Sequence, residues 1–238
     1  MTYSGAWDET TLDRILLKAS GLRDIGKRMD FLSGHFLSVP YKESTLIGSF
    51  HVPEEFVINL EGVDCFTFID YIEAMRMSAS VNEFREQLKK VRYQSGKVSY
   101  ENRNHFFTDW AAFNSGFVQD VTAQIGNQRA VPVKKALNKK EDGALFLEGI
   151  QARERALHYI PSESVDKGVV DALETGDYIG IYSKIQGLDV SHVGIFIQRR
   201  DETHLRHASS VKEHRKVVDQ DFMEYLEGKP GIIVLRPK

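Results

Sequence analysis

The stretch Asp64-Cys-Phe-Thr-Phe-Ile-Asp-Tyr-Ile-Glu-Ala-Met-Arg-Met-Ser78 decides how this chain folds, because it combines a helical pattern with the only cysteine of the sequence. Apolar residues recur along it at spacings of three and four: Cys65, Phe68, Ile69, Ile72 and Met75. This period is typical of a helix with a buried stripe, and Asp64 suits the N-cap position. We therefore expect a helix over about residues 64–78, with Cys65 in its first turn.

Helices are also predicted on both sides of this stretch. Upstream, two runs of apolar residues recur at helical spacing: Leu12, Ile15 and Leu16, then Ile25, Met29, Leu32 and Phe36. Prolines and a glycine interrupt the pattern afterwards, so the N-terminal helical part, about residues 8–62, should be loop-rich from residue 38 onward. Downstream, Ser80-Val-Asn-Glu83 is a capping-box sequence that predicts a third helix to about residue 92.

The second half of the chain changes from helical to strand periodicity. Residues 93–160 form an elaboration in which we expect a solvated loop at the basic cluster 134–140 and a short helix over 151–159. Beyond it, alternating patterns predict strands at 178–182, 193–197, 203–208 and 231–235. Helices first and strands afterwards favour an α+β fold with an antiparallel sheet over about residues 175–236, in a single domain of residues 1–238.

Composition and charge exclude several classes of protein. The 238 residues are 42% hydrophobic and 27% charged, which is typical of a globular chain. A net charge of -3 gives no electrostatic basis for sequence-independent nucleic-acid binding. No apolar run approaches the ~18 residues of a membrane helix. Residues 1–7 lack the features of a secretory leader, so we expect either a cytosolic protein or the trimmed form of an exported one.

The single cysteine excludes an intramolecular disulfide and any metal site built from several cysteines. At the first turn of a helix, unpaired N–H groups and the helix dipole would stabilise a Cys65 thiolate. The same N–H groups could hold an oxyanion formed by thiol attack. The alternative is that Cys65 is a small buried residue of the apolar stripe, and that Asp64 is only its helix cap.

Two histidines lie in strands that are predicted to be neighbours. His192 precedes the strand 193–197, and His207 lies in the next one. If the loop between them has an even number of residues, both side chains project from the same face, whereas an odd loop would replace His207 with His204. A base held by a second polar group beside a thiol is what nucleophilic catalysis needs. The alternative is that each is an ordinary strand residue.

Four motifs follow one another along the chain: Val63-Asp-Cys-Phe-Thr-Phe68, Thr175-Gly-Asp-Tyr-Ile179, Ser191-His-Val-Gly-Ile195 and Arg206-His-Ala-Ser209. In this order they resemble the motif set of the NlpC-like papain-fold cysteine hydrolases of bacterial cell walls. Three further segments resemble the N-acetylmuramoyl-L-alanine amidase-like branch: Phe36-Leu-Ser-Val-Pro-Tyr41, Arg103-Asn-His-Phe-Phe-Thr-Asp-Trp110 and Val234-Leu-Arg-Pro237. The similarity covers nearly the whole chain.

The resemblance implies a papain-like core, in which the helix that carries the nucleophile packs on an antiparallel sheet that carries the base. It implies that Cys65 is the nucleophile, His192 the base and His207 the orienting third member. Asp64 matches an acidic residue that binds a free amine in related peptidases. The chain departs from the commoner pattern by having Phe-Thr, not Ser-Gly, after Asp-Cys, which changes the floor of the pocket.

Substrate-binding residues are expected in two places. In the segment 103–110, Asn104 and His105 offer polar groups suited to a sugar or a carboxylate, and Trp110 offers a flat surface. Ser191 lies directly before the predicted base. The alternative for the segment 103–110 is a surface turn that buried aromatic residues hold in place.

The implied function is a cysteine amidase that cleaves the lactyl–L-Ala amide of N-acetylmuramoyl peptides in peptidoglycan, without a cofactor or a metal. Its partners would be muropeptides, in the bacterial periplasm or cell envelope, with the cytoplasm as the alternative location. Three other functions stay open. They are a γ-D-glutamyl–diamino acid endopeptidase of the same fold, a metal hydrolase that uses His192, His207 and Asp177, and a non-catalytic wall-binding module.

Overall fold

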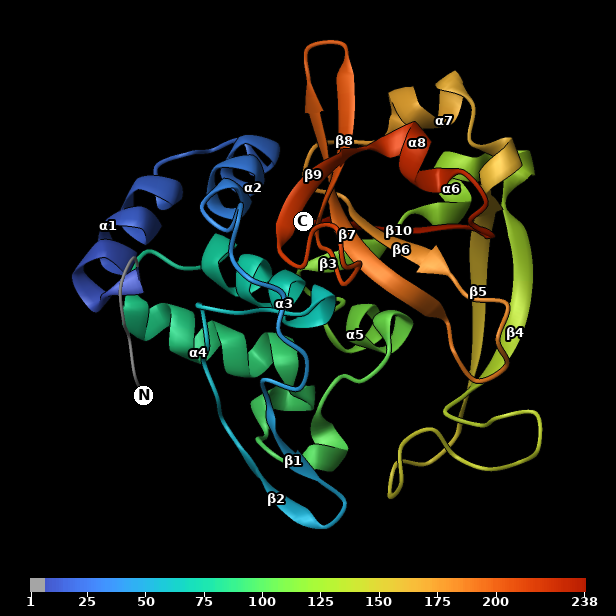
Figure 1. Cartoon of the computed structure of the whole chain (residues 1–238), viewed down its shortest axis with the longest axis horizontal. Coiled ribbons are helices and arrows are strands. Elements are labelled where there is room, and N and C mark those ends of the chain that lie inside the picture. Colours follow the sequence, from blue (N-terminus) through green and yellow to red (C-terminus); the bar gives the residue numbers. More distant parts are fainter. Residues whose placement is uncertain (1–6) are drawn as a thin grey trace.

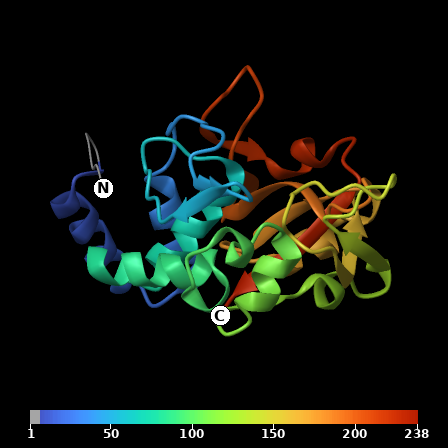
Figure 2. The same cartoon turned by 90° about the horizontal axis from the view of Figure 1, so that it is seen from below.

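The computed structural model describes residues 7–238, so residues 1–6, on which the interpretation of the leader largely rests, lie outside the described residues. Helices of the first half lie on one side and an antiparallel sheet lies on the other (Figure 1). Figure 2 shows the same division after a turn of 90°. The predicted mixture of helices with an antiparallel sheet is confirmed.

Four helices make up most of the first half: α1 (Glu9–Ser20), α2 (Ile25–Gly34), α3 (Cys65–Arg76) and α4 (Val81–Arg92). The predicted starts of α3 and α4 are confirmed, because Asp64 and Ser80 are their N-caps. The segment expected to be loop-rich contains a short hairpin, β1 (Ile47–Ser49) and β2 (Val52–Glu55), which lies apart from the eight-stranded sheet (Figure 1).

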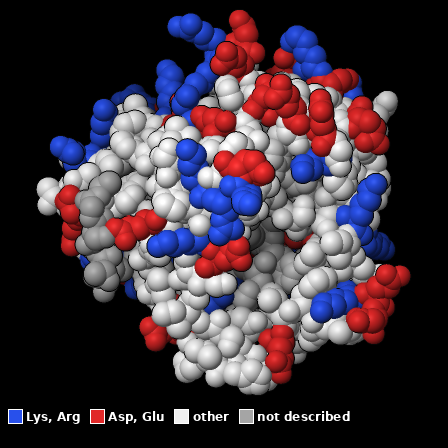
Figure 3. All heavy atoms as spheres, in the orientation of Figure 1, with Lys and Arg blue, Asp and Glu red and all other residues white. Residues whose placement is uncertain are grey.

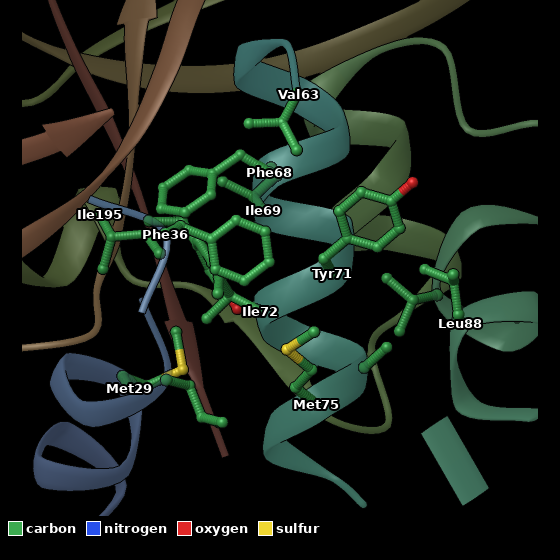
Figure 4. Close-up of a cluster of buried hydrophobic side chains, with 14 of the residues drawn as sticks. Met29, Phe36, Val63, Phe68, Ile69, Tyr71, Ile72, Met75, Leu88 and Ile195 are labelled. Carbon is green, nitrogen blue, oxygen red and sulfur yellow. The ribbon is translucent and has the colours of Figure 1, made fainter. Parts of the chain in front are cut away.

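Helix α3 is buried on all sides and not along one stripe only. Figure 4 shows side chains that leave it toward α2, α4 and the sheet. Every residue from Thr67 to Arg76 is buried, including Asp70, Glu73 and Arg76. A helix that is apolar around most of its circumference belongs in the centre of a core, and α3 lies there.

One sheet contains eight strands in the order β4-β5-β10-β6-β7-β8-β9, with β3 paired to β10. All of the pairings are antiparallel. The strands are β3 (Val118–Asp120), β4 (Val131–Leu137), β5 (Arg153–Pro161), β6 (Tyr178–Tyr182), β7 (Val190–Arg199), β8 (Glu202–Ala208), β9 (Val217–Asp221) and β10 (Gly231–Pro237). The four strands predicted by alternation are therefore confirmed as β6, β7, β8 and β10.

Three predictions about residues 93–160 are wrong. This segment supplies β3, β4 and β5, so the sheet is not confined to about residues 175–236. The expected helix over 151–159 is strand β5, and the expected solvated loop at 134–140 largely belongs to β4. Charged residues favour helices in isolation, yet pairing of β4 with β5 overrides that preference, and lysines are common on an edge strand such as β4.

Helices cover both faces of the central strands. One face packs on α3 through residues such as Val193, Ile195 and Ile233. The other face packs, through Ile179 and Leu205, on a cluster that includes residues of the short helices. These short helices are α6 (Thr122–Gly126), α7 (Lys167–Ala172) and α8 (Phe222–Leu226). A fourth short helix, α5 (Phe107–Phe113), packs on the same side as α3. No helix within residues 7–238 is long and apolar enough to cross a membrane.

Trp110 belongs to the core of this arrangement and not to a surface. Its side chain is fully buried, and its Nε1–H donates to Asp70 Oδ1 at 3.0 Å. The other oxygen of Asp70 accepts from Arg92 Nε, also at 3.0 Å. The role predicted for Trp110 as a substrate-binding surface is therefore not supported, because a ring with no exposed area cannot contact a substrate.

We expect Trp110→Ala to lower the free energy of unfolding by about 3–5 kcal/mol, because it leaves a large cavity. Trp110→Phe should cost less, about 1–3 kcal/mol, since the ring remains but Asp70 loses one donor. Urea denaturation measures both. The control is Leu17→Ala on α1, which removes a side chain that is 66% exposed and should change stability by no more than about 0.5 kcal/mol. Equal effects of Trp110→Ala and Leu17→Ala would contradict the prediction.

Candidate active site

A cavity of about 360 Å³ lies where the N-terminus of α3 meets the start of β7. Its walls come from α3, from the segment before α5, from the loop between β4 and β5, and from the β6–β7 connection. The lining residues are Cys65, Phe66, His105, Phe106, Phe107, Phe146, Leu147, Leu188, Asp189, Val190, Ser191, His192 and Val193. The structure thus brings four of the predicted site residues, Cys65, His105, Ser191 and His192, to one cavity.

Local capping positions the thiol. Asp64 Oδ1 accepts from the backbone N–H groups of Phe66, at 3.0 Å, and Thr67, at 2.7 Å, and the Thr67 hydroxyl completes a capping box by accepting from the Asp64 backbone N–H at 3.0 Å. The cap takes the second and third N–H groups of α3 but not that of Cys65. The first turn of α3 therefore presents the Cys65 side chain together with its own backbone N–H, which is a suitable donor for an oxyanion.

His192 and His207 are directly hydrogen-bonded, with Nε2 of His192 2.7 Å from Nδ1 of His207. The pairing of β7 with β8 joins Ile195 to Arg206, so facing residues sum to an odd number and the predicted register is confirmed. His204 lies on the other face of β8 by the same rule. The β6–β7 pairing is irregular opposite His192, between Ile181 and Tyr182, as is common beside functional sites.

A third group, Gln220 of β9, was missed by the sequence analysis. His207 Nε2 lies 2.6 Å from Gln220 Oε1. Strand β9 pairs His207 with Val218, which places Gln220 two residues further along the same face as a diagonal neighbour. No strand was predicted over residues 217–221, because its short sequence Val-Val-Asp-Gln-Asp has no clear alternation. With that strand assigned, the same odd-sum rule would have found Gln220.

This chain of hydrogen bonds selects one tautomer for each ring. Since the Gln220 carbonyl oxygen can only accept, His207 carries its proton on Nε2 and accepts through Nδ1. His192 must then donate from Nε2, and in its neutral form its Nδ1 is an acceptor. A neutral imidazole whose remaining nitrogen is an acceptor is ready to take a proton, as a general base must be.

Burial acts against ionisation of Cys65 and His192. Burial, and after it the Asp64 carboxylate, raises the pKa of Cys65 to about 12, although nearby backbone N–H groups of Val193, Cys65 and Phe66 oppose the shift. Burial lowers the pKa of His192 to about 3, helped by His207 and Lys229. Desolvation therefore acts against the Cys65 thiolate that the helix N-terminus was expected to stabilise.

The predicted substrate-binding residues divide into two groups. His105 and Ser191 line the cavity, and His105 Nε2 donates to the Tyr100 carbonyl at 2.8 Å. Asn104 does not line it, since this side chain is 4% exposed and its amide donates to the Val91 carbonyl at 3.0 Å. Asn104 and Trp110 thus support the segment from the inside, and His105 with Phe106 forms its cavity-facing surface.

Another wall that the sequence analysis missed is the loop 138–150. Asn138 is fully buried with a left-handed backbone (φ 72°), and its side-chain amide donates to the carbonyls of Leu147, at 2.9 Å, and Ile150, at 2.6 Å. It also accepts from the Leu147 N–H at 2.7 Å. Because these bonds fix the loop, Phe146 and Leu147 are held at the cavity.

The rival metal site is not assembled in the described chain. Across residues 7–238, no three His, Cys, Asp or Glu side chains are grouped so that they could hold a metal ion. Asp177, the carboxylate that this alternative requires, instead accepts from Arg236 Nε at 2.8 Å and from Arg236 Nη2 at 2.7 Å.

Figure 3 shows acidic and basic side chains mixed over one face of the molecule, with a hollow of mainly uncharged atoms below its centre.

Comparison with known proteins gives one family match. The model of a family described as AmiA-like, N-acetylmuramoyl-L-alanine amidase-like, matches residues 31–232. No curated protein matches the chain.

Several solved structures are similar over most of the chain. An N-acetylmuramoyl-L-alanine amidase from Bacteroides uniformis is 31% identical, with a TM-score of 0.72, over 90% of this chain and 99% of that one. A Bacteroides fragilis protein with a provisional xylanase name is 30% identical, with a TM-score of 0.67, over 86% of this chain and 98% of that one. Protein LPG0564 of Legionella pneumophila, of family DUF1460, shares the fold, with a TM-score of 0.81 at 24% identity over 96% of this chain and 94% of that one.

We expect iodoacetamide to alkylate Cys65 slowly at pH 8 and about tenfold faster for each unit of added pH, because only the thiolate reacts and burial raises the pKa to about 12. Mass spectrometry reports the reaction cleanly, since the chain has one cysteine. The chain unfolded in urea is the reference and should react at least ~100-fold faster at pH 8. A rate that levels off below pH 8 in the folded protein would show that the thiolate is the resting form.

The histidine pair should make the fold sensitive to acid. Burial lowers the pKa of His207 to about 4, so below pH 6.5 the unfolded chain binds a proton that the folded chain refuses. Its contribution to stability is complete above about pH 6.5 and is lost toward pH 4, by roughly 3 kcal/mol. Urea denaturation between pH 7.5 and pH 4.5 should therefore show a shallower decline in His207→Gln than in the unmodified protein or in the exposed control His158→Gln. Parallel declines in all three would refute this origin of acid sensitivity.

Proposed function

The chain belongs to the AmiA-like family of N-acetylmuramoyl-L-alanine amidase-like proteins, and we propose that it is a cysteine amidase that cleaves the lactyl–L-Ala amide of N-acetylmuramoyl peptides. One observation carries the proposal. The hydrogen-bonded chain Gln220–His207–His192 ends at the cavity that also holds the only cysteine. An amide bond needs an activated nucleophile and an acid for its leaving nitrogen, and this arrangement supplies both groups.

In the first step, the Cys65 sulfur attacks the lactyl carbonyl carbon while the thiol proton moves to Nδ1 of His192. The backbone N–H at the start of α3 stabilises the oxyanion of the tetrahedral intermediate. His192 then gives its proton to the amine nitrogen of L-Ala, the C–N bond breaks and a lactyl thioester remains on Cys65. Water attacks this thioester, His192 takes the proton of the water, and the thiol is restored with release of the lactyl carboxylic acid.

His207 and Gln220 orient the base during these steps. When His192 becomes positively charged, its Nε2–H donates to His207, and His207 in turn donates to Gln220. Both partners are neutral, so they fix the ring without stabilising its charge as strongly as a carboxylate would. A weakly stabilised imidazolium is a strong acid, which suits protonation of a poor leaving group such as an amine.

The arrangement also supports the finer proposal of a papain-like core. The nucleophile lies at the first turn of α3, and α3 packs on β7 and β8, the strands that carry the two histidines. Because its proposed substrates are peptidoglycan fragments, we further propose that the protein is located in the bacterial cell envelope or periplasm.

Two rival functions of the same cavity can be compared with this one. A γ-D-glutamyl–diamino acid endopeptidase would use the same catalytic groups. Asp64 could contribute there through Oδ2, since the cap uses Oδ1. The amidase is preferred because the family and the Bacteroides uniformis relative, 31% identical, both bear that name. A glycosidase, as the xylanase name of another relative suggests, needs two carboxylates across the substrate, whereas Asp189 is the only carboxylate among the residues that line this cavity.

We expect N-acetylmuramoyl-tripeptide to be converted to N-acetylmuramic acid and a free tripeptide that begins with L-Ala, as identified by mass spectrometry. The activity should survive EDTA and disappear in Cys65→Ala. Cleavage after the second residue of the stem, with the sugar still attached to L-Ala, would replace the amidase with the endopeptidase. Loss of activity in EDTA that zinc restores would exclude the cysteine mechanism.

Variants of the histidines separate the roles within the site. His192→Ala should lower kcat/KM by about 100-fold to 10,000-fold, since it removes the acid and the base. His207→Ala should cost less, because His192 remains. The matched control is His204→Gln on the opposite face of β8, which should leave the rate unchanged.

A further inference from the structure

A second cavity, of about 260 Å³, adjoins the one that holds the thiol. His105 and Phe106 line both cavities, so these two residues form the shared wall. The second cavity continues from this wall toward α5 and β5, where Asp109 and Arg153 line it. A substrate bound at Cys65 that extends past His105 would enter this second cavity.

The charged side chains that line the second cavity are Glu101, Arg103, Asp109 and Arg153. The guanidinium of Arg103 is bound by both carboxylate oxygens of Glu54. The carboxylate of Glu101 is occupied locally, by its own backbone N–H and by Ser99, which lower its pKa. Neither group is therefore well placed to bind a charged ligand.

Arg153 differs from these groups. Asp109 accepts from Arg153 Nη1 at 3.0 Å and also from Arg155 Nη2, so that two guanidinium groups share one carboxylate. Within residues 7–238, this is the one hydrogen bond of the Arg153 side chain, which is 44% exposed. Its guanidinium also lies 4.8 Å from the ring centre of Phe113, which holds it in place. Arg153 thus offers guanidinium N–H donors that no protein group in the described chain uses, at the wall of the cavity.

We propose that Arg153 binds a free carboxylate of the stem peptide, in the residue that follows L-Ala. This inference rests on the proposed function, because it assumes that the amine of L-Ala is the leaving group. A planar carboxylate matches the two parallel N–H donors of a guanidinium. His105 contributes to the same path, since its Nε2 is held by the Tyr100 carbonyl and its other ring nitrogen can accept an N–H of the peptide.

A third cavity, which lies beside α8, is less suited to an anion. This cavity, of about 610 Å³, is lined by Lys184 and Lys229 but also by Glu163, Glu224 and Glu227. Lys229 is close to the site, because its charge lowers the pKa of both His192 and His207. The three glutamates outnumber the two lysines, however, so we place the carboxylate at Arg153.

The test compares two substrates, N-acetylmuramoyl-L-Ala-D-Glu with a free α-carboxylate and N-acetylmuramoyl-L-Ala-D-isoglutamine with a neutral amide in its place. We expect a kcat/KM about tenfold or more in favour of the free acid, as for a charge-assisted hydrogen bond. Arg153→Met should bring the acid to the level of the amide and leave the amide nearly unchanged. Asp109 keeps Arg155 as its partner in this variant, and a thermal unfolding curve confirms the fold.

The matched control is Arg129→Met. Arg129 has a similar exposure, 43%, and a similar ion pair, with Asp166, but it lines none of the three cavities, so this variant should keep the preference. A preference that is absent from the unmodified protein, or that persists in Arg153→Met, overturns the proposal. A preference for the acid that is lost in Lys229→Met and kept in Arg153→Met also overturns the proposal. It would place the carboxylate in the cavity that Lys229 lines.

Failure of the proposed function is recognised separately. It shows as the absence of cleavage before L-Ala in either substrate. In that case, titration of Cys65→Ala with the two intact substrates still tests Arg153, because binding needs no turnover. The proposal is supported if Cys65→Ala binds the acid more tightly than the amide and the double variant Cys65→Ala/Arg153→Met binds both equally. Equal binding of acid and amide by Cys65→Ala refutes it.

Discussion

The paired charges inside α3 are the constraint on which the rest of the structure depends. Asp70 accepts hydrogen bonds from Arg92 of α4 and from Trp110 of α5. Glu73 is bound by Arg76 and by the Tyr178 hydroxyl of β6, the latter at 2.6 Å. A buried carboxylate without its partners would cost several kcal/mol, so α3 can adopt only the rotation and depth at which both are satisfied. The same rotation turns Cys65 into the cavity. The buried carboxylates of Asp70 and Glu73 thereby fix the position of Cys65 at the N-terminus of α3.

Burial also explains how one site can hold a thiol and two histidines without premature reaction. Desolvation raises the pKa of Cys65 and lowers that of His192, so an isolated thiolate–imidazolium pair is disfavoured. Proton transfer from sulfur to imidazole is then favourable only when the new charges have partners. In the proposed mechanism, a bound substrate removes the need for one partner, because its carbonyl carbon reacts with the thiolate as it forms. In the proposed mechanism, ionisation of the thiol is thereby coupled to the arrival of the amide.

The sequence allowed prediction of those parts of the site that local rules control. The start of α3 follows from the Asp64 cap and the apolar spacing after it, and the shared face of His192 and His207 follows from strand parity alone. Gln220 could not be found this way, because its strand has no alternation and forms only through pairing with β8. Strand β5 was mistaken for a helix for the same kind of reason, since its charged residues favour a helix until β4 pairs with them. Local sequence patterns therefore predicted the positions of Cys65, His192 and His207. The positions of Gln220 and of strand β5 depend on pairing between strands, which these patterns do not contain.

The origin of the cavity walls shows why substrate choice is the harder inference. Cys65 and His192 come from the core helix and the central sheet, whereas His105, Phe106, Phe146 and Leu147 come from the elaboration of residues 93–160. Within this elaboration, neighbouring residues have opposite tasks: Asn104 and Trp110 point into the core, and His105 and Phe106 face the cavity. Such a division cannot be read from the order of the residues, because no regular period relates them. In the proposed enzyme, a change in these loops would alter which amide reaches the thiol and leave Cys65 and His192 in place, which is how one scaffold can serve several amide cleavages.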